Sequence, residues 1–501
     1  MASDASPPGE EEEKVRRRSR KELRGKEVKK KEVQVEDIDK LTSAGHRALQ
    51  EGWADGALSC FNAALQAARQ IKDSRVLRAC SFNLGAAYVE AGRPQEGLDF
   101  LQQVQPGPKA DRLPDLQFNL ALAHNALGQS QEAAAYFLQA AQLYRSQGDG
   151  GNEGDACMEL SCCYSREQDS SLAVQGFLRA AESYRVAAML DSSAAALKEA
   201  GSHMIQSDQF SHNDIIDVLT ECLSLTDSIT DPRTLGELYL WVGVSYCRLR
   251  CFQEAVQCFH QALGPSAQQP PLLAKVLHNL GAALNSEGRF TAAVSYHRQA
   301  AELYGSLGCR GDQARCFSNL ALACSQLGDE EEAAESFILA LQGFRDTKDR
   351  LAEVQVCELL AECYRKQRKQ QKAAQLYKQA LSALTHCQDT SGRVRDRLTV
   401  ALQQSLLPQR PRPLRQHQSP PVRHLVRKSD VTQSPGRASN QQPDDQRREG
   451  PGELWSDRKN PPTDSETSLV QEEQALPTGP DDLREATPSL ARWRSRFCSL
   501  M

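Results

Sequence analysis

The chain has 501 residues, sixteen cysteines and a net charge of -5. This near-neutral balance argues against a general nucleic-acid-binding protein, and the length allows two to four domains or one long repeat array. The opening "MASDASPPGE" lacks the apolar core of a secretory signal, and no stretch approaches the roughly 18 apolar residues of a membrane-spanning helix. We therefore expect a cytoplasmic protein with reduced thiols; a nuclear location is less favoured.

The N-terminal arm, residues 1–35, is highly charged. Residues 14–31 carry eleven Lys or Arg against two Glu, directly after the acidic run Glu10–Glu13. A nuclear-localisation or nucleic-acid patch is one interpretation. A solvated, disordered arm is the favoured one, because neighbouring runs of opposite charge are typical of such segments.

The sequence between the flanks repeats itself. "FNLGAAYVEAG", "FNLALAHNALG", "HNLGAALNSEG" and "SNLALACSQLG" each place Asn-Leu before a small residue and end on Gly. This small residue marks the register, and its successive positions indicate nine units with a period near 40. The nine markers are Gly45, Gly85, Ala121, Ser161, Gly201, Gly243, Gly281, Ala321 and Ala361.

Each unit reads as a helical hairpin. A second phrase rich in Ala follows the first, and an aromatic residue usually stands sixteen positions after the marker. Small residues allow two antiparallel helices to approach closely, and we expect the aromatic ring to fill the wedge between one hairpin and the next. A glycine between the two phrases is expected to end the first helix in a left-handed cap. It is Gly52, Gly92, Gly128, Gly288 or Gly328.

This pattern resembles the tetratricopeptide repeat family over roughly residues 36–385. The long period is similar to the Pins/LGN polarity adaptors within that family. The resemblance implies an all-α fold: an α-solenoid of about nine tetratricopeptide-type helical hairpins with disordered N- and C-terminal flanks.

The fifth unit departs from the pattern, because "SDQFSHNDIIDVLTECLSL" lacks the Ala-aromatic phrase. We therefore expect a first repeat block over 36–190, a degenerate fifth unit or joint over 191–232, and a second block over 233–388. Residues 389–407 have the apolar spacing of a capping helix. The Pro-, Gln- and Arg-rich tail, 408–501, is expected to be disordered.

No catalytic or cofactor motif is found. Phosphate-binding, dinucleotide-binding, zinc-protease and nucleophile-elbow patterns are all missing, so we expect no enzyme, no cofactor and no small-molecule substrate. Cys247, Cys251 and Cys258 with His260 have helical spacing, but no second ligand cluster completes a zinc tetrad, so no metal is expected. The scattered histidines, including His278 and His297, are better explained by packing.

The resemblance implies that the first helix of each unit lines a concave groove that binds extended or helical peptide segments of a protein partner. The residue before the unit's Leu is expected to face this groove, and an Asn amide there can donate to and accept from a peptide backbone. One turn earlier, two cations suggest binding of an acidic peptide. The predicted groove residues are Asn83, Asn119, Lys275, Asn279, Arg315 and Asn319. The alternative is that each Asn satisfies the backbone of a neighbouring helix.

Partial motifs point to two more specific partners. Lys275, Asn279 and Asn319 resemble part of a clamp for chaperone C-termini, but the next unit offers Gln355 and Leu359, which puts that binding in doubt. The alternative function is a Pins/LGN-like regulator of G-protein α subunits through Asp444–Arg447, the "DDQR" of such motifs. The apolar half that should precede this motif is missing.

The chain ends in Cys498-Ser499-Leu500-Met501, which fits the farnesylation pattern C-a-a-X. Arg492, Arg494 and Arg496 would add attraction to an anionic membrane surface, since one lipid alone holds a protein only marginally. Membrane association is expected only if Cys498 is lipidated. An inert end is the alternative.

Overall fold

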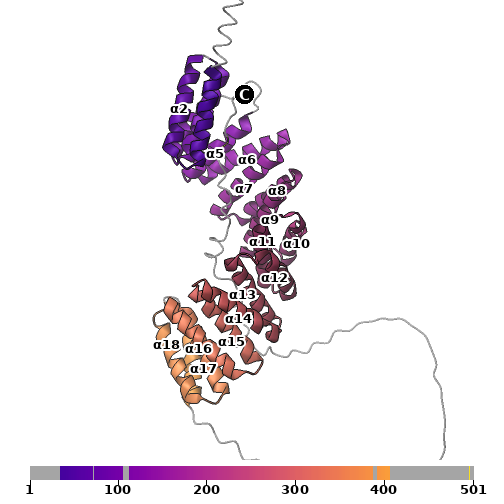
Figure 1. Ribbon diagram of the computed structural model, residues 1–501, viewed down its shortest axis with the longest axis vertical. Helices are drawn as coiled ribbons and strands as arrows, with labels where there is room; N and C mark the ends of the chain where they lie inside the picture. Colours follow the sequence, from indigo (N-terminus) through magenta and orange to yellow (C-terminus); the bar gives the residue numbers. More distant parts are fainter. Residues whose placement is uncertain (1–33, 72, 105–111, 388–391, 407–495, 497–501) are drawn as a thin grey trace, which may run out of the picture.

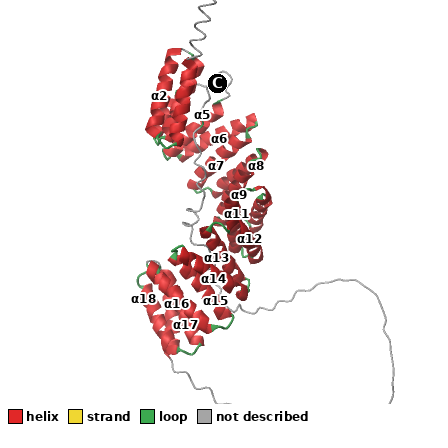
Figure 2. Ribbon diagram, viewed as in Figure 1, coloured by secondary structure: helices red, strands yellow, loops and turns green. Residues whose placement is uncertain are grey.

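The computed structural model describes residues 34–71, 73–104, 112–387, 392–406 and 496. Within those residues all regular structure is helical, and no strand occurs (Figure 2). The helices follow one another in hairpins along an elongated, curved stack that runs from α2 to α18 (Figure 1). The all-α solenoid predicted from the repeat is confirmed.

The helices pair as the nine repeat units require. The hairpins are a helix over residues 34–50 with α2 (Ala54–Ile71), α3 (Ser74–Glu90) with α4 (Pro94–Gln102), α5 (Leu113–Ala126) with α6 (Ser130–Gln147), α7 (Gly150–Arg166) with α8 (Ser170–Val186), α9 (Leu190–Gln206) with α10 (His212–Ser224), α11 (Pro232–Arg248) with α12 (Phe252–Ser266), α13 (Pro270–Ser286) with α14 (Phe290–Ser306), α15 (Arg310–Gln326) with α16 (Glu330–Thr347), and α17 (Arg350–Lys366) with α18 (Gln370–Leu384). Helix α19 (Gly392–Leu406) follows.

The turn inside each hairpin except the fifth has the expected left-handed residue; in the fifth, Ser207 after α9 is extended, with a φ of -115°. All five predicted capping glycines have a positive φ between 75° and 83°. In three of the turns that lack the glycine another residue adopts the same conformation: Gln168, Arg250 and Arg368 have φ values of 58° to 61°. Because side chains with a Cβ pay for this conformation, these three turns are imposed by packing of the flanking helices.

Small markers and aromatic rings bring the two helices of a hairpin together. A Cβ added at Gly243 on α11 would lie 2.5 Å from the ring of Phe259 on α12. The ring therefore packs against the marker of its own hairpin, a contact that the expected filling of the wedge between hairpins does not include. An aromatic ring also reaches the neighbouring hairpin, since Phe177 stacks on His203 of the next hairpin at 5.3 Å.

The fifth hairpin is the irregular one. Helix α10 has 13 residues, and the short 3-10 helix η1 (Thr226–Ser228) joins it to α11. Its buried side chains, such as Leu219 and Cys222, nevertheless belong to one apolar core that continues from α5 to α15. That residues 191–232 act as a joint between two repeat blocks stays a prediction.

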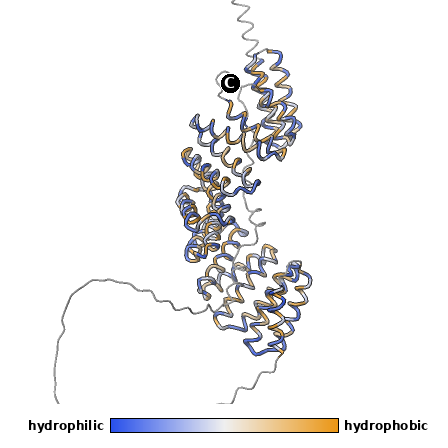
Figure 3. Tube along the Cα trace, turned by 180° about the vertical axis from the view of Figure 1, so that it is seen from behind, coloured by the Kyte–Doolittle hydropathy of each residue, from blue (hydrophilic) through white to orange (hydrophobic). Residues whose placement is uncertain are grey.

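Most helices are amphipathic, with apolar and polar residues interspersed along the trace (Figure 3). At the end of the stack, α19 packs on α18 and buries Leu398 completely. This contact covers apolar residues of α18 that would otherwise face water, as a capping helix should. None of the helices in the described residues is both long and apolar enough to cross a membrane.

Candidate peptide-binding face around Arg496

The first helices of the hairpins form one face of the stack, and Asn119 on α5 lies on it. Its side-chain Nδ2 donates to the carbonyl oxygen of Arg496, and its Oδ1 accepts from the backbone N–H of Arg496, both at 2.7 Å. The Asn119 side chain is buried. One side-chain amide thus satisfies both backbone groups of a residue far away in the sequence. Neither hydrogen bond involves the side chain of that residue.

The side chain of Arg496 makes separate contacts with Phe118 and Asp155. Its guanidinium carbon lies 4.6 Å from the centroid of the Phe118 ring, and its Nη2 donates to Asp155 Oδ2 on α7. The arginine side chain keeps 24% of its exposure. Burial would lower the pKa of Arg496, but the hydrogen bond and charge of Asp155 outweigh it, so the pKa is raised. Arg496 is therefore a fixed cation on this face. We call Phe118, Asn119 and Asp155 the Arg496 site.

Two tyrosines hold the carboxylates of this face in place. The Tyr184 hydroxyl donates to Asp155 Oδ1 at 2.8 Å, and the Tyr144 hydroxyl donates to Asp115 Oδ1 at 2.6 Å. Burial and the adjacent carboxylate raise the pKa of both phenols, so both remain protonated donors. Tyr184 thereby leaves the second oxygen of Asp155 to Arg496, while the second oxygen of Asp115 accepts from Arg112 at 3.2 Å.

Asp115 and Asp155 were missed in the sequence, although a signal for them existed. Both stand six residues before the marker of their unit, which is the register of Lys275 and Arg315 in later hairpins. The same position on the same face is therefore acidic on α5 and α7 and basic on α13 and α15. This change of charge along one register of the repeat is the signal that marks Asp115 and Asp155 in the sequence.

The acidic character continues beyond Asp155. In the two hairpins that follow Asn119, its register is occupied by Glu159 and Glu199. Burial, with the Asp155 charge adding and the Arg166 charge opposing, raises the pKa of Glu159 to about 7. Burial raises the pKa of Glu199 as well. Burial makes these carboxyl groups costly to ionise. A cation that binds beside them would stabilise their ionised forms.

The other predicted groove residues have different surroundings. Asn279 donates from Nδ2 to the carbonyl oxygen of Lys275, one turn earlier in its own helix, at 2.8 Å. Arg315 forms an ion pair with Asp312 at 3.6 Å. Two further asparagines of the set are buried: Asn83 and Asn319. Binding of a partner by the six predicted residues stays a prediction.

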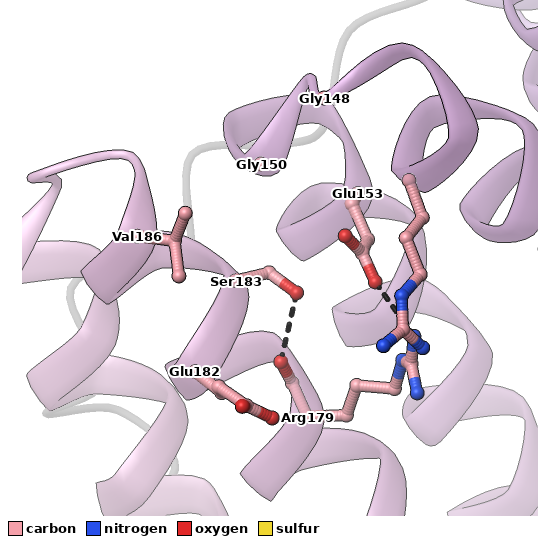
Figure 4. A pocket seen from close by; sticks show the side chains of 8 residues that line it. Gly148, Gly150, Glu153, Arg179, Glu182, Ser183 and Val186 are labelled. Atoms are coloured by element: carbon pink, nitrogen blue, oxygen red, sulfur yellow. Dashed lines mark hydrogen bonds and ion pairs between the residues drawn. The ribbon is translucent and has the colours of Figure 1, made fainter.

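A separate pocket of about 220 Å³ lies where α7 begins, between α6 and α8. Glu153 and Arg179 point toward one another there, at 2.9 Å, and Ser183 donates to the Arg179 backbone (Figure 4). In the second block Glu353 holds the corresponding place and pairs with Arg345 at 2.8 Å. The two glutamates stand at the same register, but the arginine comes from the following helix, α8, in the first case and from the preceding helix, α16, in the second. A glutamate that pairs with an arginine of a packed neighbouring helix in both repeats indicates a structural role for this pocket.

His297, Cys247 and Cys258 act as packing residues. His297 takes the place of the repeat's aromatic residue opposite Gly281, is fully buried, and has its pKa lowered to about 3, chiefly by burial. Burial raises the pKa of the Cys247 and Cys258 thiols to about 12. Among the residues that the structure describes, no three His, Cys, Asp or Glu are grouped to hold a metal ion.

Several predicted features lie outside the described residues. These are the basic arm before residue 34, the G-protein motif at Asp444–Arg447 and the lipidation candidate Cys498. Each stays a prediction.

Comparison with known proteins identifies the repeat. Models of the tetratricopeptide repeat family match residues 114–147, 272–346 and 356–394. The three segments fall on the third hairpin, on the seventh and eighth, and on the ninth. They include Asn119, Lys275, Asn279, Arg315 and Asn319 among the predicted groove residues.

Solved structures of low sequence identity are also similar to this chain. The apo form of RapI is 12% identical, covers 70% of this chain and 97% of its own, and has a TM-score of 0.45. The apo quorum sensor NprR from B. thuringiensis is 13% identical, with coverages of 70% and 99% and a TM-score of 0.38. BtubC from P. vanneervenii is 18% identical, with coverages of 52% and 97% and a TM-score of 0.37.

Proposed function

Because the chain contains tetratricopeptide repeats, we propose that it is a non-catalytic interaction scaffold that binds peptide segments of protein partners on the face formed by its first helices. One observation carries this proposal. Asn119 uses its amide to satisfy both backbone groups of Arg496, which is how a repeat surface can hold an extended chain regardless of sequence. The partner is a protein, without a cofactor or small-molecule substrate. We propose the cytoplasm as the compartment, with membrane association only if Cys498 is lipidated.

The test uses the full-length chain. Proteins that co-purify with the wild type from cells are quantified by mass spectrometry beside those that co-purify with Asn119→Ala and with the double variant Asn279→Ala, Asn319→Ala. Glu132→Gln, on the exposed side of α6, is the control for changing one polar side chain.

The proposal expects a defined set of partners to fall at least about tenfold with one of the asparagine variants and to stay constant with the control. Unchanged partners with both asparagine variants, at equal stability and expression, would remove the first-helix face as the binding surface.

A further inference from the structure

The Arg496 site belongs to a longer acidic row. Asp155 and Glu159 are four residues apart on α7, which places them on one side of the helix about 6 Å apart along its axis. Glu199 follows on α9, at the register of Glu159 in the next hairpin. Burial raises the pKa of the Cys162 thiol, and the charges of both glutamates add to this shift, as expected for carboxylates near the same side chain. The row therefore presents three carboxylates from two neighbouring first helices.

The end of the chain has the complementary pattern. The stretch "RWRSRF" places Arg492, Arg494 and Arg496 at every second residue. In an extended chain such residues point to one side and are about 6.7 Å apart, close to the spacing of Asp155 and Glu159 along their helix. Arg496 already pairs with Asp155 of this row, while Asn119 on α5 holds its backbone.

We propose that the acidic row Asp155, Glu159 and Glu199, together with Asn119, is a site for extended arginine-rich peptide, and that the chain's own C-terminal segment around Arg496 is its resident occupant. The proposal rests on the proposed function and adds which peptide chemistry the first block takes. It also adds a regulatory consequence: a partner peptide must displace Arg496 before it can bind.

Occupancy by the same chain has a clear energetic effect. The C-terminal segment is tethered to the chain, so it competes for the acidic row at a fixed local concentration. A free peptide that makes the same contacts therefore binds more weakly than it would to an unoccupied row. The partner that succeeds is basic as well, because a peptide with Glu or Asp in place of arginine would meet Asp155 with a like charge. Lys275 and Arg315, two and three hairpins beyond Glu199, belong to another part of the surface.

The experiment measures binding in trans. A fluorescent peptide of residues 489–501, with Ser in place of Cys498, is titrated with full-length wild type, with Arg496→Ala, and with Arg496→Ala combined with Asp155→Asn. Asparagine at 155 keeps an oxygen for the Tyr184 hydroxyl while the charge is removed, so the fold is preserved. Arg496→Ala with Glu132→Gln is the matched control, and thermal melting checks each variant.

The expected result is that Arg496→Ala binds the peptide at least about fivefold tighter than wild type, since its site is vacated. Adding Asp155→Asn weakens this binding by about tenfold or more, whereas adding Glu132→Gln does not. A peptide with its three arginines changed to alanine should fail to bind Arg496→Ala.

Three results would overturn the proposal. They are equal affinity of wild type and Arg496→Ala, equal affinity with and without Asp155→Asn, and a dimer that dissociates on Arg496→Ala, because the occupant would then come from a second copy. The proposed function fails differently, namely if asparagine variants of the face leave all partners bound. A face that keeps its partners but ignores Arg496→Ala refutes only the further inference.

Discussion

Asn119 and Arg496 are 377 residues apart in the sequence, and the side chain of the first holds both backbone groups of the second at 2.7 Å. Asn279 stands at the same register of a later hairpin, but its Nδ2 donates to the Lys275 carbonyl oxygen of its own helix. Equivalent residues of the repeat thus have different hydrogen-bond partners: Asn119 contacts a residue from the C-terminal segment, whereas Asn279 contacts its own helix.

The first prediction concerns protection of the chain after Arg496. Asn119→Ala removes both backbone hydrogen bonds, which together contribute on the order of 2 kcal/mol. Trypsin should then cleave the bond after Arg496 about tenfold faster or more, as followed by mass spectrometry of the intact protein. Asn279→Ala is the control and should leave this rate unchanged. If both variants are cleaved at the wild-type rate, the Asn119 contact does not hold the segment in solution.

The second prediction is that binding of the basic peptide to Arg496→Ala strengthens as the pH rises. Burial raises the pKa of Glu159 to about 7, with the Asp155 charge adding to this shift and the Arg166 charge opposing it. Glu159 is therefore largely neutral at pH 6 and ionised at pH 8, and only the ionised form attracts arginine. The dissociation constant should fall about threefold or more between these pH values.

Glu159→Gln, which cannot ionise, should flatten this pH dependence. The 489–501 peptide contains no histidine, so its own charge is constant over the range once Cys498 is replaced and the fluorophore blocks its α-amino group. A slope that persists in Glu159→Gln would assign the titration to another group.

The third prediction is that His297→Phe stabilises the protein, and more so in acid. The pKa of His297 is about 3 in the folded chain and near 6.5 when unfolded. Between these values the unfolded state binds the extra proton, so wild-type stability falls as the pH drops below about 6.5. The gap between variant and wild type should widen by about 2 kcal/mol from pH 7 to pH 5.

Phenylalanine suits this position because Phe259 occupies it in the sixth hairpin, equally close to a glycine. The change also removes His297 Nδ1, which is buried without a hydrogen-bond partner. Asn285 Nδ2 loses its contact with His297 Nε2 at 3.2 Å but keeps its bond to the Asn319 carbonyl oxygen at 3.1 Å. Urea unfolding at the two pH values measures the gap, and a gap that does not change with pH would contradict the assignment.

The fourth prediction tests the close approach inside a hairpin. Gly243→Ala places a methyl group 2.5 Å from the Phe259 ring, so the helices must separate, at a cost of about 1–3 kcal/mol. Gly311→Ala is the control, because the nearest atom, on Thr347, lies at an ordinary 3.8 Å. That change should be neutral or stabilising by up to about 1 kcal/mol in a helix. Equal melting temperatures of the two variants would contradict this view of the markers.

The fifth prediction concerns the turn that lacks glycine. Gln168 has a φ of 61°, a conformation that costs a residue with a Cβ about 1 kcal/mol or more. Gln168→Gly should therefore raise the unfolding free energy by about 0.5–1 kcal/mol. Gln139→Gly, on the exposed side of α6, should lower it by a similar amount, because glycine weakens a helix interior. Thermal melts of both variants check the opposite signs.

Much of the architecture could be predicted from local patterns. The spacing of Gly52, Gly92 and Gly128 predicts helix ends, because a left-handed cap depends on a few neighbouring residues. The part of the aromatic residues was predicted less well. Phe259 packs against its own hairpin, and only the crossing of α11 and α12 decides which neighbour a ring meets.

The sequence by itself determined the repeat period, the helical hairpins and the register of the residues on the first-helix face, since these follow from short-range spacing and capping. Only the tertiary structure decided that Asp155, absent from the predicted site, meets a cation, and that Asn119 alone of its equivalents meets Arg496 among the described residues. Such contacts join residues hundreds of positions apart. Their free energy depends on how the stacked helices orient carboxylate, ring and amide together, which no local pattern encodes.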